Sequence, residues 1–205
     1  MKEELLRKNI IGLAEPVIRS LDLVIWGLEI LHAARMIIRL YVDVPSSEED
    51  SEHKSPSVEQ CEEISRHLAL SLDVEDLIDD AYALEVSTPG FSRIFFNLDQ
   101  MRPYVGEMVE VKLCSPVVPQ LSDERFSGSD LTPRRLWRGK LSIVELENDI
   151  FVLEPATFSA DGDIFFEPFK PLPLSWNNVH KANRFHIFKR PAKPGKKAKA
   201  KISPQ

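Results

Sequence analysis

The chain has 205 residues, a formal net charge of −6 and 43% hydrophobic residues, which favours one large or two small globular domains with a real core. No apolar run reaches the roughly 18 residues of a membrane span, and the charged N-terminus is unlike a signal peptide, so we expect a cytoplasmic protein. Its two cysteines, Cys61 and Cys114, have neither a CxxC spacing nor a nearby histidine pair, which gives zinc and redox motifs no support.

The first 44 residues predict one helix followed by two strands. Residues 3–21 carry apolar side chains at helical spacing, although Pro16 should kink the helix or make it restart late. Residues 23–32 are rich in strand-forming side chains, and residues 35–44 alternate between two faces, as a strand does. A hairpin near 32–34 would join the two strands, although the usual Asn-Gly turn signal is missing.

A second helix and a third strand are predicted after an exposed loop at 45–57, which is polar, acidic and flanked by proline. Ser57 precedes Gln60 by three residues, the spacing of a capping box that opens a helix. The predicted buried stripe of this helix is Val58, Cys61, Ile64, Leu68 and Leu72. A strand at 81–86 ends in the Ser-Thr-Pro-Gly sequence of 87–90, so the order α-β-β-α-β indicates an α+β domain.

The second half predicts a small β-barrel. Short strand candidates separated by turn residues lie at 107–113, 135–145, 150–153, 164–169 and 185–188. Residues 115–134 are polar and broken by proline, so we expect a loop inserted between the first two barrel strands. The predicted division is an N-terminal α+β domain at 1–98, a barrel domain at 99–188 and a low-complexity, disordered basic tail at 189–205.

Charge is distributed unevenly along the chain. Residues 46–85 contain thirteen acids and two bases, for a charge of −11, whereas residues 189–205 contain seven bases and no acid. A basic arm on an acidic protein suits nucleic-acid phosphates, or it serves only to keep the protein soluble. The RNA-contact candidates are the bases of this arm: Lys189, Arg190, Lys193, Lys196, Lys197, Lys199 and Lys201.

Catalytic motifs are missing from the sequence. It contains no phosphate-binding glycine loop, no GxSxG and no HExxH, and its five histidines are scattered without a second ligand type at metal spacing. The acids between Asp73 and Asp80 lack the glycine and the closing glutamate of a calcium-binding EF-hand loop. We therefore expect neither an enzyme nor a cofactor or metal site.

The most individual stretch is the end of the third strand. Its candidate partner-binding residues are Glu85, Ser87, Thr88, Pro89, Gly90 and Arg93. Two hydroxyls, a turn glycine and an arginine at one rim could recognise the backbone or phosphate of a partner. Alternatively, the hydroxyls only satisfy local backbone groups at a strand end.

These residues also carry a family resemblance. The run 61–66 (CEEISR), the Leu72-Asp73 step, the run 84–90 (LEVSTPG) and Arg93 resemble the RimP family of ribosome maturation factors. Residues 39–43 are similar to an upstream strand of the family, and 137–141 and 179–183 are similar to later segments. Thr88 stands where the family has a second serine, and Ile94-Phe95 stand where it usually has Pro-Leu.

The resemblance implies an SH3-like or Sm-like barrel after the α+β domain. It also implies a non-enzymatic assembly factor required for maturation of the small (30S) ribosomal subunit. Such a factor binds the immature subunit near ribosomal protein S12 and 16S rRNA, without cofactor, membrane or small-molecule substrate. Two other classes remain open: a general Sm-like RNA-binding module without a ribosome-specific role, and an unrecognised hydrolase that uses the scattered carboxylates.

Overall fold

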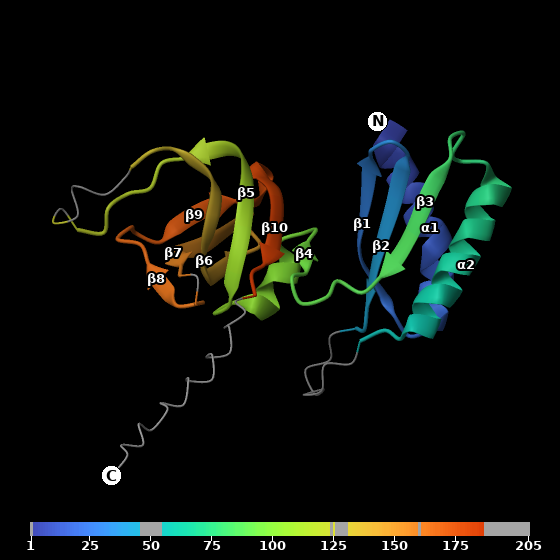
Figure 1. The fold of residues 1–205 in the computed structure, drawn as a ribbon, viewed down its shortest axis with the longest axis horizontal. Coiled ribbons are helices and arrows are strands. Elements are labelled where there is room, and N and C mark those ends of the chain that lie inside the picture. The colour runs from blue at the N-terminus through green and yellow to red at the C-terminus, as the bar shows by residue number, and fades with distance from the viewer. Residues whose placement is uncertain (1, 46–54, 124, 126–130, 160, 187–205) are drawn as a thin grey trace, which may run out of the picture.

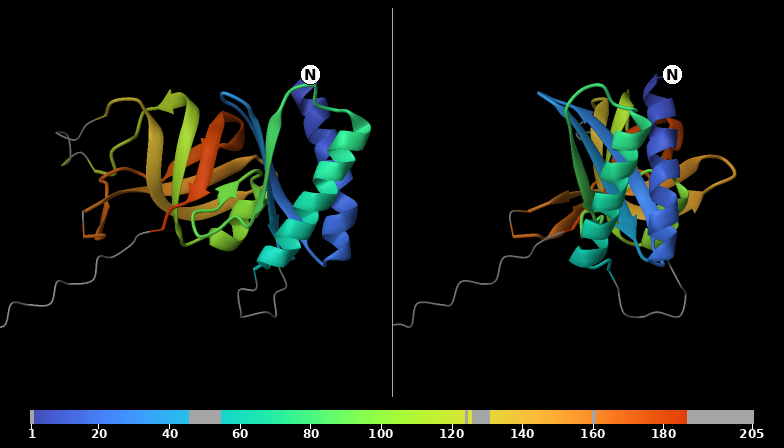
Figure 2. Two further views of the ribbon diagram at one scale, coloured as in Figure 1. Left: turned by 45° about the vertical axis from the view of Figure 1, so that its right-hand side comes forward. Right: turned by 90° about the vertical axis from the view of Figure 1, so that its right-hand side faces the viewer.

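The first half of the chain folds into a three-stranded sheet covered by two helices. The computed structural model describes residues 2–45, 55–123, 125, 131–159 and 161–186 (Figure 1). Its first elements are α1 (Lys2–Ser20), β1 (Val24–His32), β2 (Met36–Asp43), α2 (Val58–Glu75) and β3 (Tyr82–Ser87). β1 pairs antiparallel with β2, and β3 pairs parallel with β2 because α2 supplies the crossover between them. Both helices cover the sheet face that is turned away from the second half of the chain (Figure 2).

Alternation in β2 explains how this sheet is buried. Ile38, Leu40 and Val42 are completely buried and belong to one core cluster with the apolar stripes of both helices. Arg39 and Tyr41 lie on the opposite face, since successive side chains of a strand point to opposite sides. The helices therefore seal one face of the sheet and leave the other for polar and interdomain contacts.

The two helices agree with their sequence signals except at two positions. The backbone N–H of Gln60 donates to Ser57 Oγ at 3.2 Å and that of Ser57 donates to Gln60 Oε1 at 2.9 Å, so the capping box is confirmed. Val58 was wrongly assigned to the buried stripe: it opens α2, and 78% of it is exposed. A kink or a late restart was predicted at Pro16; α1 runs through Pro16 as one helix, so the late restart is wrong. No helix of the described residues is long and apolar enough to span a membrane.

The second half is a sheet whose described strand pairs are all antiparallel. Its strands are β4 (Ile94–Phe95), β5 (Met108–Val117), β6 (Arg134–Glu145), β7 (Ile150–Phe158), β8 (Ile164–Phe166), β9 (Leu172–Ser175) and β10 (Val179–Arg184). They follow the order β4-β10-β5-β6-β7-β8, with β9 also paired to β7. Among the described strands no pairing joins the two ends of this order, so the closed barrel predicted from the strand spacing is not observed.

Several strand limits differ from the sequence prediction. The last strand was placed at 185–188, but β10 ends at Arg184 and its polar residues face outward, which hides its alternation. β7 continues through Pro155 to Phe158, beyond the strand predicted at 150–153. The proline is tolerated because its carbonyl accepts from Glu167 N at 2.8 Å, and no backbone donor is needed there. Gly139 on β6 faces Pro155 on β7. A Cβ at Gly139 would meet the backbone of Glu154.

Each half has its own core cluster. The first contains residues between Ile10 and Leu72, and the second contains residues between Phe95 and Ala182. Phe95 and Leu98, which the predicted boundary assigned to the first domain, pack in the second cluster. The loop expected at 115–134 is shorter than predicted, because β5 continues through Val117 and β6 begins at Arg134. Residues 124 and 126–130 of this connection, 46–54 of the acidic loop and the whole basic tail lie outside the described residues.

Candidate functional site

The predicted partner-binding residues lie where β3 leaves the first sheet. The parallel register places Glu85 beside Arg39 and Ser87 beside Tyr41 on β2. We call the segment from Glu85 to Gly90 the rim segment. It leads directly into the connection that crosses to the second half of the chain (Figure 1).

Paired charges lie beside the rim segment, on the face of the first sheet that the helices do not cover. Arg39 Nε donates to Glu85 Oε2 at 2.6 Å, and this hydrogen bond is the main reason that the pKa of Arg39 is raised. Glu29 Oε2 accepts from the Tyr41 hydroxyl at 2.9 Å, while Lys181 Nζ lies 3.2 Å from Glu29 Oε1. Burial, followed by the bond to Glu29, raises the pKa of Tyr41. Glu85 is thus held by Arg39, and its carboxylate is already neutralised.

The turn of the rim segment presents hydroxyls and bare backbone. Pro89 is buried, and Gly90 has φ = +65° with open space around it, a left-handed conformation that suits a turn glycine. Ser87 and Thr88 are half-buried, and their hydroxyls have no hydrogen-bond partner among the described residues. Phe91 follows with 73% of its surface exposed. These groups are available to a partner.

Arg93 lies in the junction between the two halves rather than on a free rim. Its Nη1 donates to Asp43 Oδ2 at 2.8 Å, with 20% and 12% of the two side chains exposed. Its guanidinium lies 4.9 Å from the centre of the Trp26 ring and 5.6 Å from that of Tyr104. An arginine enclosed by a carboxylate and two aromatic rings stabilises the contact between the elements that carry those groups. Its proposed role in binding a partner would have to act through the junction.

Trp26 and Gly27 provide the rest of this junction. The β1–β2 register skips one residue between Ile25 and Gly27, and the resulting bulge redirects Trp26. Trp26 Nε1 donates to the Ile94 carbonyl at 2.7 Å, and the Trp26 carbonyl accepts from Gln100 Nε2 at 2.6 Å. Gly27 is buried under the Phe96 ring, which leaves no room for a Cβ. The rim segment therefore lies next to a tightly packed contact between the two halves.

Other candidate chemistry is sparse. The described residues contain no group of three or more His, Cys, Asp or Glu side chains arranged to hold a metal ion. The seven basic RNA-contact candidates, from Lys189 to Lys201, lie outside the described residues, so they stay a prediction from sequence.

Comparison with known proteins identifies the family to which the chain, including its rim segment, is similar. A model of the RimP N-terminal domain matches residues 13–92. The chain is 47% identical to the ribosome maturation factor RimP of Desulfovibrio desulfuricans, over 96% of this chain and 86% of the relative. The chain belongs to the RimP family. A second RimP, from Nitratidesulfovibrio vulgaris strain DP4, is 37% identical over 93% of this chain and 96% of its own. The resemblance stated from the sequence is confirmed.

Sequence patterns alone missed the junction residues Asp43 and Trp26. Asp43 ends a buried strand and Trp26 stands in an apolar run, so each looks ordinary in sequence. Their partners lie 50 and 68 residues further along the chain. Phe91 was also missed, because an aromatic residue beside a turn gives no local sign of its exposure.

Proposed function

We propose that this protein is a non-enzymatic assembly factor for the small (30S) ribosomal subunit, which binds the immature subunit near ribosomal protein S12 and 16S rRNA. The observation that carries the proposal is the 47% identity with a named ribosome maturation factor over 96% of the chain. An assembly factor of this kind works by binding and release, which agrees with the absence of catalytic motifs in the sequence.

The rim segment is the proposed contact in the first half. Ser87 and Thr88 offer unpaired hydroxyls, Gly90 offers accessible backbone, and exposed Phe91 offers apolar surface. Aromatic side chains such as Phe91 are enriched in protein–protein interfaces, and nearby hydroxyls and backbone groups can supply hydrogen bonds to a partner. Because the rim segment continues into the junction, the binding of a partner here would depend on how the two halves are positioned relative to each other.

Charge supports a division between two kinds of partner. The acidic region at 46–85 attracts a basic protein, for which S12 is the candidate implied by the family, and it repels RNA. The basic arm at 189–205 suits the phosphates of 16S rRNA. We also propose two folding units divided just before β4 (Ile94–Phe95), which pairs in the second sheet. The proposed second unit is related to the SH3-like barrel but open at its edges, which the strand order supports.

The experiment is a sucrose-gradient profile of a strain that lacks the gene. Immature small subunits should accumulate, and the protein should co-sediment with free small subunits rather than with 70S ribosomes. The deletion should be rescued by the wild type and by Ser175→Ala, an exposed control on β9, but poorly by Ser87→Ala/Thr88→Ala. A normal profile, or equal association with 70S ribosomes, would reject the proposal. RNA affinity that survives removal of the first half would instead favour a general RNA-binding module.

A further inference from the structure

The edge strand β8 exposes an unusual amount of apolar surface. It ends the strand order of the second sheet, and β7 is its only strand partner among the described residues. Ile164, Phe165 and Phe166 are 43%, 57% and 56% exposed. Natural edge strands are normally protected by charge, proline or a covering element, because an exposed apolar edge pairs with other chains. Three consecutive apolar side chains on such an edge mark a pairing surface.

The backbone of β8 also has hydrogen-bonding groups to offer. Ser159 N donates to Asp163 O at 3.0 Å, and Glu167 N donates to Pro155 O at 2.8 Å. In an antiparallel ladder the residues that bond to the partner strand alternate with residues whose N–H and C=O point the other way. The inward set is therefore 163, 165 and 167. Ile164 and Phe166 direct their backbone groups outward, where a further strand can bind.

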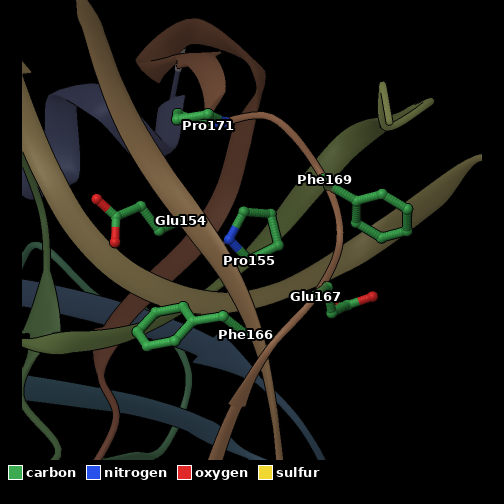
Figure 3. A pocket seen from close by; sticks show the side chains of 6 residues that line it. All are labelled: Glu154, Pro155, Phe166, Glu167, Phe169 and Pro171. Carbon is green, nitrogen blue, oxygen red and sulfur yellow. The ribbon is translucent and has the colours of Figure 1, made fainter. Parts of the chain in front are cut away.

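An acidic and aromatic hollow adjoins this edge. It has a volume of about 180 Å³ and is lined by Glu154, Pro155, Phe166, Glu167, Phe169 and Pro171 (Figure 3). In Figure 3 Glu154 and Phe166 lie on one side of Pro155, and Glu167 and Phe169 on the other. Glu167 is paired with Arg134 at 2.9 Å, whereas Glu154 has no ion pair among the described residues. A free carboxylate beside an aromatic ring is suited to a lysine or arginine side chain.

The charge of this region selects between possible occupants. Residues 150–169 contain Glu154, Asp161, Asp163 and Glu167 and no lysine or arginine. Glu167 is paired with Arg134, and Lys140 on β6 is the cross-strand neighbour of Glu154, so Asp161 and Asp163 supply the excess negative charge. RNA phosphates would be repelled here. A second copy paired edge to edge would bring two sets of these carboxylates together, which is unfavourable. A basic segment gains from the same field.

We propose that β8 and the adjoining hollow form a docking site for a basic, extended segment of a partner protein. The segment adds to the sheet as a strand, bonds to the outward backbone groups of Ile164 and Phe166, and places a cationic side chain beside Glu154. Strand addition supplies affinity through the main chain, and the hollow supplies selectivity. This site adds a partner-binding surface to the proposed function. That the partner is a ribosomal component rests on the proposed function; the docking site itself does not.

The test uses purified full-length protein and a fluorescent peptide of about ten residues, a common strand length, with alternating lysine and valine. Fluorescence anisotropy measures its dissociation constant. Three further probes are the same peptide with N-methylated backbone, a glutamate–valine peptide and a single-stranded RNA. Ile164→Pro removes one outward N–H, and Ile164→Ala is its matched control because it removes the side chain but keeps the donor. Glu154→Gln removes the free carboxylate, and amide NMR spectra establish that each variant is folded.

The basic peptide should bind and should perturb the amide signals of 164–166. N-methylation and Ile164→Pro should each weaken binding at least about tenfold, whereas Ile164→Ala should weaken it less. Glu154→Gln should raise the dissociation constant several-fold and reduce its salt dependence. N-methylation tests strand addition even where Ile164→Pro disturbs the hairpin, since it leaves the protein unchanged.

No binding, equal binding of the acidic peptide, or displacement of the peptide by RNA would overturn the proposal. Binding that develops only after truncation following His186 would also overturn it, and would assign the site to the chain's own basic segment. If the peptide does not bind but the deletion strain has an abnormal ribosome profile, this site is rejected and the assembly role is kept. Peptide binding with a normal profile would keep the site and reject the assembly role.

Discussion

Arg93 and Asp43 form an ion pair of 2.8 Å that joins the last residue of β2 to the connection before β4. The pair is mostly buried, and the guanidinium also covers the faces of Trp26 and Tyr104. Fifty residues separate the two partners in sequence. The pair links the strand that carries the first core to the segment that begins the second.

Removing one partner of this pair should destabilise the junction. The sequence alone led us to expect that Arg93→Ala leaves folding nearly intact and weakens only subunit binding. The buried pair leads to a different expectation, because Arg93→Ala leaves Asp43 without its counter-charge. We expect a loss of about 2 kcal/mol in the free energy of unfolding, measured by urea denaturation.

A double-mutant cycle separates this pair from its surroundings. Asp43→Asn alone should cost a similar amount, and the double variant should cost clearly less than the sum. Arg102→Ala is the matched control, since its contact to Asp99 is exposed and 3.5 Å long. Additive effects of Arg93→Ala and Asp43→Asn would show that the pair contributes nothing.

Gly27 should be irreplaceable for a different reason. It is buried under the Phe96 ring, where a Cβ would overlap ring carbons. Gly27→Ala should therefore lower the melting temperature by displacing Phe96 and loosening the contact between the halves. Phe96→Ala should partly rescue it, because the smaller side chain removes the overlap. A melting temperature unaffected by Gly27→Ala would mean that the ring moves away freely.

Local signals predicted the elements well and the contacts between them poorly. Ser57 and Gln60 predicted the start of α2, and the alternation of 35–44 predicted β2, because caps and strand faces depend on near neighbours in sequence. The bulge at Trp26 and the pairing of Arg93 depend on groups brought together only by the complete fold. β10 was placed too late because its neighbours β4 and β5 hold a polar segment in the sheet.

The rim segment shows the same limit. Its turn could be predicted, since Pro89 and Gly90 act on their own backbone, and Gly90 does adopt a positive φ. Its exposed Phe91 could not, because exposure is decided by what packs nearby. A sequence motif can thus locate a site without identifying which of its residues are free to bind.

Gly90→Val should cost about 1 kcal/mol or more, because a β-branched residue is strained at φ = +65°. Space is not the obstacle, since no atom lies within 4 Å of an added Cβ. Gly90→Asn is the matched control, as asparagine tolerates this conformation better. Thermal unfolding of both variants measures the difference. Equal melting temperatures for valine and glycine would show that the turn relaxes to an ordinary conformation.

All three tyrosines should titrate late. Burial raises the pKa of Tyr41, Tyr82 and Tyr104 above the ordinary value of 10.0. A raised pKa in the folded state gives stability that is fully present below pH 10 and is lost as the pH rises further, because the unfolded chain releases its phenol protons first. Ultraviolet titration should give phenolate midpoints above 10 for the folded protein and near 10 in urea. Tyr41→Phe should lose less stability over this range, and coincident titrations of folded and unfolded protein would contradict the prediction.

Truncation after Phe188 should separate the two proposed partners. The removed segment carries seven bases and no acid, so its loss should lower affinity for small subunits and flatten the salt dependence, since each phosphate neutralised releases counterions. Affinity for isolated S12 should fall far less, or rise, because a basic arm no longer competes for the acidic region at 46–85. Titration of full-length and truncated protein against both targets at two salt concentrations measures this. If truncation weakens both interactions equally, or neither, the segment is not an RNA-binding arm.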